Sequence, residues 1–165
     1  MIKAIEKNFE KGIYLLSIIS DAQYSNQSVP PYFSSIGSHF RHTLDMFSCV
    51  INGFNLGNID LTIRERNKLA EQECEVGILY SNTLLKKIKL FTEQDLKSVI
   101  LITDDFGFGK HTAKTTLRAA LMQAQSHAIH HYATIGFIIY QLGIDLPDND
   151  FGYNPTTTNK NPIAS

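Results

Sequence analysis

The sequence has few features of a nucleic-acid-binding, membrane or secreted protein. Its 165 residues carry 15 Lys and Arg against 16 Asp and Glu, and no basic stripe mixes with aromatic residues. The sequence therefore lacks the basic surface that binding to nucleic acid requires. Residues 1–9 are amphipathic, and Lys and Glu interrupt them too often for a signal peptide or a membrane span. We expect a cytoplasmic protein with neither a nucleic-acid nor a membrane partner.

Cysteine is scarce, and repeats and linkers are missing. Cys49 and Cys74 are the only two cysteines, and neither lies in a C-x-x-C pair. A cytoplasmic protein with this pattern has no disulfide framework, so we expect both to pack between helices. An apolar content of 43% over this length fits one domain with a real core. We predict that this domain spans residues 1–155 and that residues 156–165 form a loose tail.

Apolar residues recur at helical spacing in four segments. Thr62 opens the third with a Thr-x-x-Glu capping box, and that segment is close to thirty residues long. Gly77 in its middle implies that another helix approaches closely there or that the helix bends. The predicted helices are residues 2–21, residues 34 or 35 to 53, residues 62–91 and residues 115–142.

A β-branched, apolar stretch separates the third and fourth predicted helices. Residues 96–103 favour a strand, and the turn residues 104–107 follow them. We therefore predict a short hairpin at this place. The predicted fold is all-α, an antiparallel four-helix bundle with a small β-hairpin between helices three and four, because short connections place sequential helices side by side.

Three of the six histidines fall within five residues of the last predicted helix. His127 and His131 are four apart, so they share one face beside the apolar stripe, whereas His130 points more than about 100° away. This is the spacing of metal ligands, although a single H-x-x-x-H pair is also typical of histidines that simply form hydrogen bonds beside a core. A metal site needs a third ligand from another segment.

The second predicted helix supplies two candidates for the third ligand. His39 lies roughly 60° from the apolar stripe of this helix, and His42 lies about 120° from it. His39 therefore borders the core as His127 does, and His42 leans toward solvent. We predict a metal site of His39, His127 and His131.

Several segments together resemble the DinB-like superfamily of metal-binding four-helix bundles (DinB/YfiT type). They are I-G-S-H-F-R-H-T-L-D at residues 36–45, Arg64-x-Arg66, S-H-A-I-H-H-Y-A at residues 126–133, and F-G-x-x-P at residues 151–155. They are most similar to a branch in which a hairpin precedes helix four. The resemblance covers nearly the whole chain. It implies a divalent metal, zinc or nickel before iron or cobalt, held by His39, His127 and His131 with water in the open positions.

The resemblance also implies an activity. The superfamily includes thiol-dependent transferases and isomerases, so we predict a metal-dependent hydrolase or a thiol S-transferase. Its partner would be a small-molecule substrate, such as a low-molecular-weight thiol. The branch usually has Ser-Ser-x-x-Arg-Glu where this chain has T-T-L-R-A at residues 115–119, so the carboxylate of that pattern is missing and no catalytic residue is assigned.

The sequence is also compatible with other interpretations. The chain could be a non-catalytic bundle that binds a metal or a small molecule, or one whose histidines are purely structural. His42 and His130 could orient the ligands or simply be exposed. The resemblance, together with the spare aromatic residues Phe151 and Tyr153, further predicts a homodimer.

Overall fold

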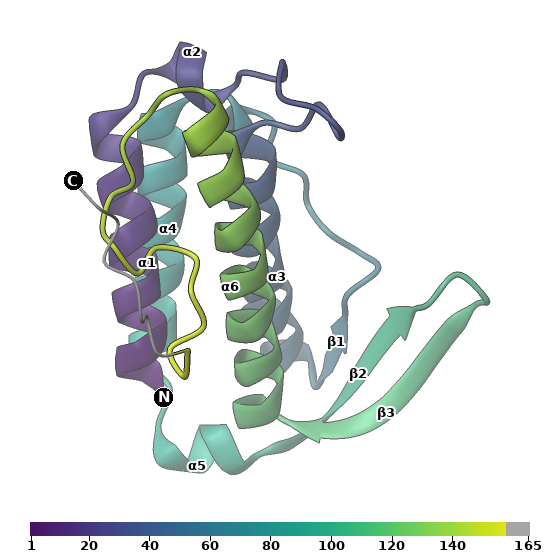
Figure 1. Cartoon of the computed structure of the whole chain (residues 1–165). Coiled ribbons are helices and arrows are strands. Elements are labelled where there is room, and N and C mark those ends of the chain that lie inside the picture. The colour runs from purple at the N-terminus through teal and green to yellow at the C-terminus, as the bar shows by residue number, and fades with distance from the viewer. Residues whose placement is uncertain (158–165) are drawn as a thin grey trace.

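A computed structural model describes residues 1–157 of the chain and shows a mostly helical fold with a small sheet (Figure 1). Four long helices lie side by side, and the predicted hairpin between the third and fourth of them is confirmed. None of the described helices combines the length and apolar character needed to cross a membrane. The elements are α1 (Ile2–Ile18), α2 (Asp21–Tyr24), α3 (Ile36–Leu56), β1 (Asn58–Asp60), η1 (Leu69–Glu71), α4 (Cys74–Lys89), α5 (Glu93–Lys97), β2 (Val99–Asp105), β3 (Lys110–Thr116) and α6 (Leu117–Gln141).

The directions of the long helices differ from the predicted antiparallel order. Gly37 at the start of α3 lies against Glu71, just before α4, so these two helices start at the same end and run in parallel. Lys89 at the end of α4 pairs with Glu6 at the start of α1, which makes α1 and α4 antiparallel. The prediction was wrong for α3 and α4 because the connection between them is long. Residues 57–73 return along the side of the helices instead of turning tightly (Figure 1).

The start of α3 follows the sequence signal closely. The Ser38 amide donates to Ser35 Oγ at 2.9 Å, and the Ser35 amide donates to Ser38 Oγ at 3.1 Å. This reciprocal cap satisfies two amides that would otherwise lack partners. The helix continues past the predicted end at Gly53 and stops at Gly57, whose φ of 72° ends the helix in the left-handed conformation.

The start of α4 does not follow the sequence signal. The Thr62 hydroxyl and amide both donate to Asp60 Oδ1, at 2.6 and 2.9 Å, so the Asp60 side chain holds a turn where a helix was predicted. α4 begins at Cys74 instead, and the backbone amide of Cys74 donates to Asp21 Oδ1. Of the two alternatives predicted for Gly77, the close approach of another helix is found, because a Cβ there would lie 2.7 Å from Leu16 Cδ2 of α1.

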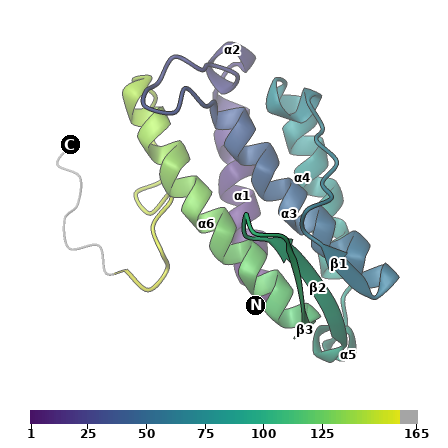
Figure 2. The ribbon, with the colours of Figure 1, turned by 90° about the vertical axis from the view of Figure 1, so that its right-hand side faces the viewer.

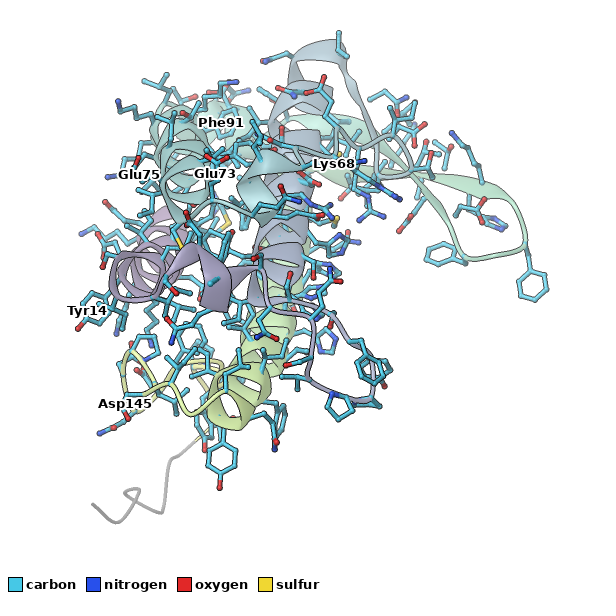
Figure 3. All side chains as sticks on the ribbon, turned by 90° about the horizontal axis from the view of Figure 1, so that it is seen from above. Tyr14, Lys68, Glu73, Glu75, Phe91 and Asp145 are labelled. Carbon is cyan, nitrogen blue, oxygen red and sulfur yellow. The ribbon has the colours of Figure 1, made fainter. Side chains whose placement is uncertain are left out.

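The sheet joins the hairpin to the connection between α3 and α4. β2 pairs with β3 in antiparallel register, with Val99 opposite Thr116, and β1 pairs with β2 in parallel, with Asn58 opposite Leu101. β1 was not predicted. Viewed from above, the hairpin extends away from the helices (Figure 3). Figure 2 shows the same hairpin in front of the α3 and α6 pair.

The segment after α6 packs back onto the helices. Phe151 is 3% exposed and stacks on Tyr132 with ring centroids 5.0 Å apart, whereas Tyr153 is about half exposed. Phe151 is therefore not a spare aromatic residue for a subunit interface, and the homodimer stays a prediction. Most of the predicted tail, residues 158–165, lies outside the described residues.

Candidate metal centre

Four histidines meet where α3 and α6 lie against each other. His39 and His42 are three apart on α3, and His127 and His131 are four apart on α6, so each pair lies along one helix face. The two helices run in opposite directions, and this places His39 against His131 and His42 against His127. All four side chains are half-buried.

Three of these side chains point one nitrogen at a common place. His127 Nε2 lies 2.8 Å from His42 Nε2 and 3.0 Å from His131 Nε2. In residues 1–157, one ligand atom from each of the three lies within 4.8 Å of the others, which is the arrangement of a group able to hold a metal ion. Two nitrogens bound to one tetrahedral zinc at about 2.0–2.1 Å are roughly 3.3 Å apart. The contacts of 2.8 Å and 3.0 Å are somewhat shorter than this separation but close to it.

Hydrogen bonds alone cannot satisfy this arrangement. Each neutral imidazole has a single N–H, and His127 Nε2 offers one in-plane lone pair or one proton to two neighbouring Nε2 atoms. A cation at the meeting point would instead accept all three lone pairs. The donor set therefore fits a divalent metal that prefers imidazole nitrogen, such as zinc or nickel.

The protonation state of the histidines also suits metal binding. Burial, reinforced by Arg64 and the neighbouring imidazoles, lowers the pKa of His42 to about 4. Burial and the other histidines lower the pKa of His131 to about 3, and burial lowers the pKa of His39 and His127 as well. The neutral form, which is the form that binds a metal, is thus the one present near pH 7.

The structure places His42, and not His39, in the group with His127 and His131. His39 adjoins it through a contact of 2.8 Å between its Nδ1 and His131 Nδ1, while its Nε2 lies 2.8 Å from Ser34 Oγ. This chain from Ser34 through His39 can fix the ring of His131, as outer partners do in known metal sites. A direct ligand role for His39 stays a prediction.

His42 was expected to lean toward solvent, and the geometry of α3 explains the difference. Burial on α3 extends beyond the predicted apolar stripe, because α3 packs against α4, α6 and β1 together. The additional buried residues include Leu44, Asp45 and Met46. An angle of about 120° from the stripe therefore points at α6 and not at solvent. The H-x-x-H spacing of His39 and His42 was the signal that could have identified both residues.

His130 and the arginines of the segments that resemble the DinB-like superfamily have separate surroundings. Arg41 donates from Nη1 to Asp45 Oδ2 at 2.7 Å and from Nε to Glu71 Oε2 at 2.8 Å, so this ion-pair network joins α3 to η1. His130 is exposed, with its ring centroid 5.4 Å from that of His131. Arg66 is exposed too. Arg64, in contrast, touches the group: its Nη1 lies 3.1 Å from His42 Nδ1.

Comparison with known proteins agrees with the fold. The sequence matches no family model and no curated protein. A DinB-like protein from Bacillus subtilis, YjoA, superposes with a TM-score of 0.64 at 22% identity, covering 87% of this chain and 92% of its own. A DinB-like protein from Bacillus cereus ATCC 10987 superposes with a TM-score of 0.65 at 16% identity, covering 88% and 93%. The predicted resemblance is thus confirmed in its fold: the chain has the fold of the DinB-like proteins.

Proposed function

We propose that the protein binds one divalent metal ion, zinc or nickel, through His42, His127 and His131. The convergence of three Nε2 atoms from α3 and α6 supports this most directly. The scaffold would be a four-helix bundle of the DinB type, formed by α1, α3, α4 and α6. His39 and Ser34 would hold the ring of His131 in the orientation that presents Nε2.

We further propose that the centre serves a metal-dependent hydrolase or a thiol S-transferase acting on a small molecule. Three neutral imidazoles leave a coordination position open, and a metal in such a site lowers the pKa of a bound water or thiol. No glutamate or aspartate belongs to the three-residue group, so the protein residues contribute binding and orientation there. Ala119 replaces the carboxylate usual in the branch that the sequence resembles.

Metal analysis of untagged protein tests the centre. Wild-type protein dialysed against zinc should retain one equivalent, and His42→Ala, His127→Ala and His131→Ala should each lose stoichiometric binding. His39→Ala should weaken binding about 10–100-fold, because it removes only an orienting partner. His130→Ala is the matched control on the exposed side of α6 and should bind as wild type does.

Two results would contradict this ligand set. Full retention of zinc by His42→Ala together with its loss by His39→Ala would assign the third ligand to His39. Retention by all four variants would make the histidines structural. The activity is tested separately, by ester hydrolysis and by conjugation of a small thiol to an aromatic halide, each with zinc-loaded and nickel-loaded protein. Turnover that His131→Ala abolishes supports the enzyme, and metal binding without either reaction supports a non-catalytic role.

A further inference from the structure

Arg64 is a half-buried cation beside the histidine group, and no ion pair of residues 1–157 includes it. Arg41, also near the group, is by contrast neutralised by Asp45 and Glu71. A guanidinium keeps its charge at any physiological pH and presents a planar fork of donors. Arg64 therefore has donors that no carboxylate in the described part of the chain uses.

The guanidinium packs against the ring of His42 without blocking its metal-binding nitrogen. Arg64 Nη1 is almost equally far from both ring nitrogens, 3.1 Å from Nδ1 and 3.4 Å from Nε2. The lone pairs of these nitrogens diverge in the ring plane, so one atom cannot lie on both axes. Nη1 must therefore sit toward the face of the ring, as in a cation–π contact. His42 Nε2 stays directed at His127 Nε2.

The charges of the loaded centre do not balance. Three neutral imidazoles leave the two positive charges of the metal uncompensated, and Arg64 adds a third. The buried carboxylate of Asp45 already accepts from Arg41 and Tyr80. Asp104 influences His127 electrostatically but is not part of the three-residue group. A site with this surplus favours a ligand that brings negative charge.

We propose that Arg64 makes the metal centre selective for small molecules that carry a carboxylate, which the metal and the Arg64 guanidinium bind together. The proposal rests on the proposed metal centre and adds the substrate class to it. A carboxylate has two oxygens, one for an open coordination position and one for the guanidinium, and charge-assisted bonds of this type are among the stronger ones in proteins.

Cobalt-loaded protein provides the test, because the visible absorption of Co²⁺ reports a ligand that enters its coordination sphere. Acetate is titrated as the probe, and acetamide serves as its uncharged counterpart. We expect wild-type protein to bind acetate at least about tenfold more tightly than Arg64→Gln does, since a bond between charged groups is lost. Arg64→Lys should fall between them, because it keeps the charge and loses the fork.

Arg66→Gln is the matched control, since Arg66 is exposed and lies two positions away. It should bind acetate as wild-type protein does. Equal acetate affinity of Arg64→Gln and wild type, at equal cobalt content, would overturn the proposal while leaving the metal centre intact. Loss of cobalt from Arg64→Gln would show that the arginine supports His42 instead. Failure of wild-type protein to take up cobalt would overturn the metal centre and this proposal together.

Discussion

The Asp45 side chain is 1% exposed and carries a carboxylate into the helix core. The pKa of Asp45 is raised above its ordinary value, because the effect of burial exceeds that of the hydrogen bonds from Arg41 and Tyr80, which lower it. An ionised carboxylate in this position depends on its cation, because a buried charge without a partner is far more costly than a missing surface ion pair. The network fixes the turn of α3 that carries His42.

We therefore expect Arg41→Met to lower the free energy of unfolding by about 3 kcal/mol. The double variant Arg41→Met/Asp45→Leu should recover most of this loss, because no unpaired charge remains. Lys89→Met is the control: Lys89 is exposed and its partner Glu6 is only partly buried, so the change should stay within about 1 kcal/mol. Urea denaturation measures all three. A loss for Arg41→Met no larger than for Lys89→Met would mean that solvent reaches Asp45.

Two of the three histidines that the structure groups together, His127 and His131, were among the residues predicted from the sequence, and the third, His42, was not. His127 and His131 were identified from a spacing of four, which needs only helix geometry. The choice between His39 and His42 depended on which sides of α3 are covered, and neighbouring helices decide that. Periodicity gives the centre of an apolar stripe but not how far burial extends on either side of it. The contact of Arg64 with His42 crosses from the connection to the helix, so no local pattern predicts it.

The end of α3 and strand β1 approach so closely that only glycine fits between them. A Cβ on Gly53 would lie 2.6 Å from Ile59 Cα and 2.7 Å from Asn58 O, and both are backbone atoms that cannot move without shifting β1. Gly136 on α6 is the opposite case, since its nearest foreign atom would be Leu146 Cδ2 at 3.9 Å. Replacing glycine by alanine should therefore change the free energy of unfolding in opposite directions at positions 53 and 136.

Gly53→Ala should lower the free energy of unfolding by about 1–3 kcal/mol through this overpacking. Gly136→Ala should raise it by up to about 1 kcal/mol, because alanine favours the helix and meets ordinary contact distances. Thermal or urea denaturation of the two variants beside wild type gives both values. Stabilisation by Gly53→Ala would show that β1 is not held against α3 in solution.

Elements with strong local signals were predicted well, and those set by distant contacts were not. The Ser35 cap placed the start of α3, and the β-branched run placed β2. Thr62 also begins a capping-box pattern, but its amide donates to Asp60 Oδ1 in a turn and no helix starts there. β1 has only three residues, and Asn58 and Asp60, which favour turns, flank the buried Ile59, so the strand depends on its pairing with β2. The long connection then sends α4 parallel to α3, which no helix pattern reveals.

Across the whole molecule, the assembly of four histidines links stability to pH. The unfolded chain binds protons on histidine near the ordinary pKa of about 6.5. In the metal-free folded protein the pKa of His42 is about 4 and that of His131 about 3, so these rings remain neutral. Between about pH 6.5 and pH 4 the unfolded state binds more protons than the folded state, so the free energy of unfolding must fall as the pH falls.

We predict that the protein in a metal chelator loses stability steadily from pH 6.5 toward pH 4 and not between pH 8 and 7. Chemical denaturation at intervals of half a pH unit measures the slope. His131→Asn should flatten this slope, because it removes one ring whose pKa is lowered in the folded protein. An equal slope in wild type and His131→Asn would show that the cluster takes up protons as ordinary histidines do.

The pairing of α3 with α6 also sets a time order during synthesis. His42 and His127 are 85 positions apart, and at translation rates of about 5–20 residues per second roughly 4 to 17 s separate their appearance. During that interval α3 has no α6 to cover it, and the growing chain holds one of the three converging nitrogens. Before α6 emerges, His42 is the only member of the proposed ligand set in the chain, so a metal ion bound there would lack the two ligands from α6. A metal ion at the proposed site would therefore meet its full ligand set only after α6 has packed against α3.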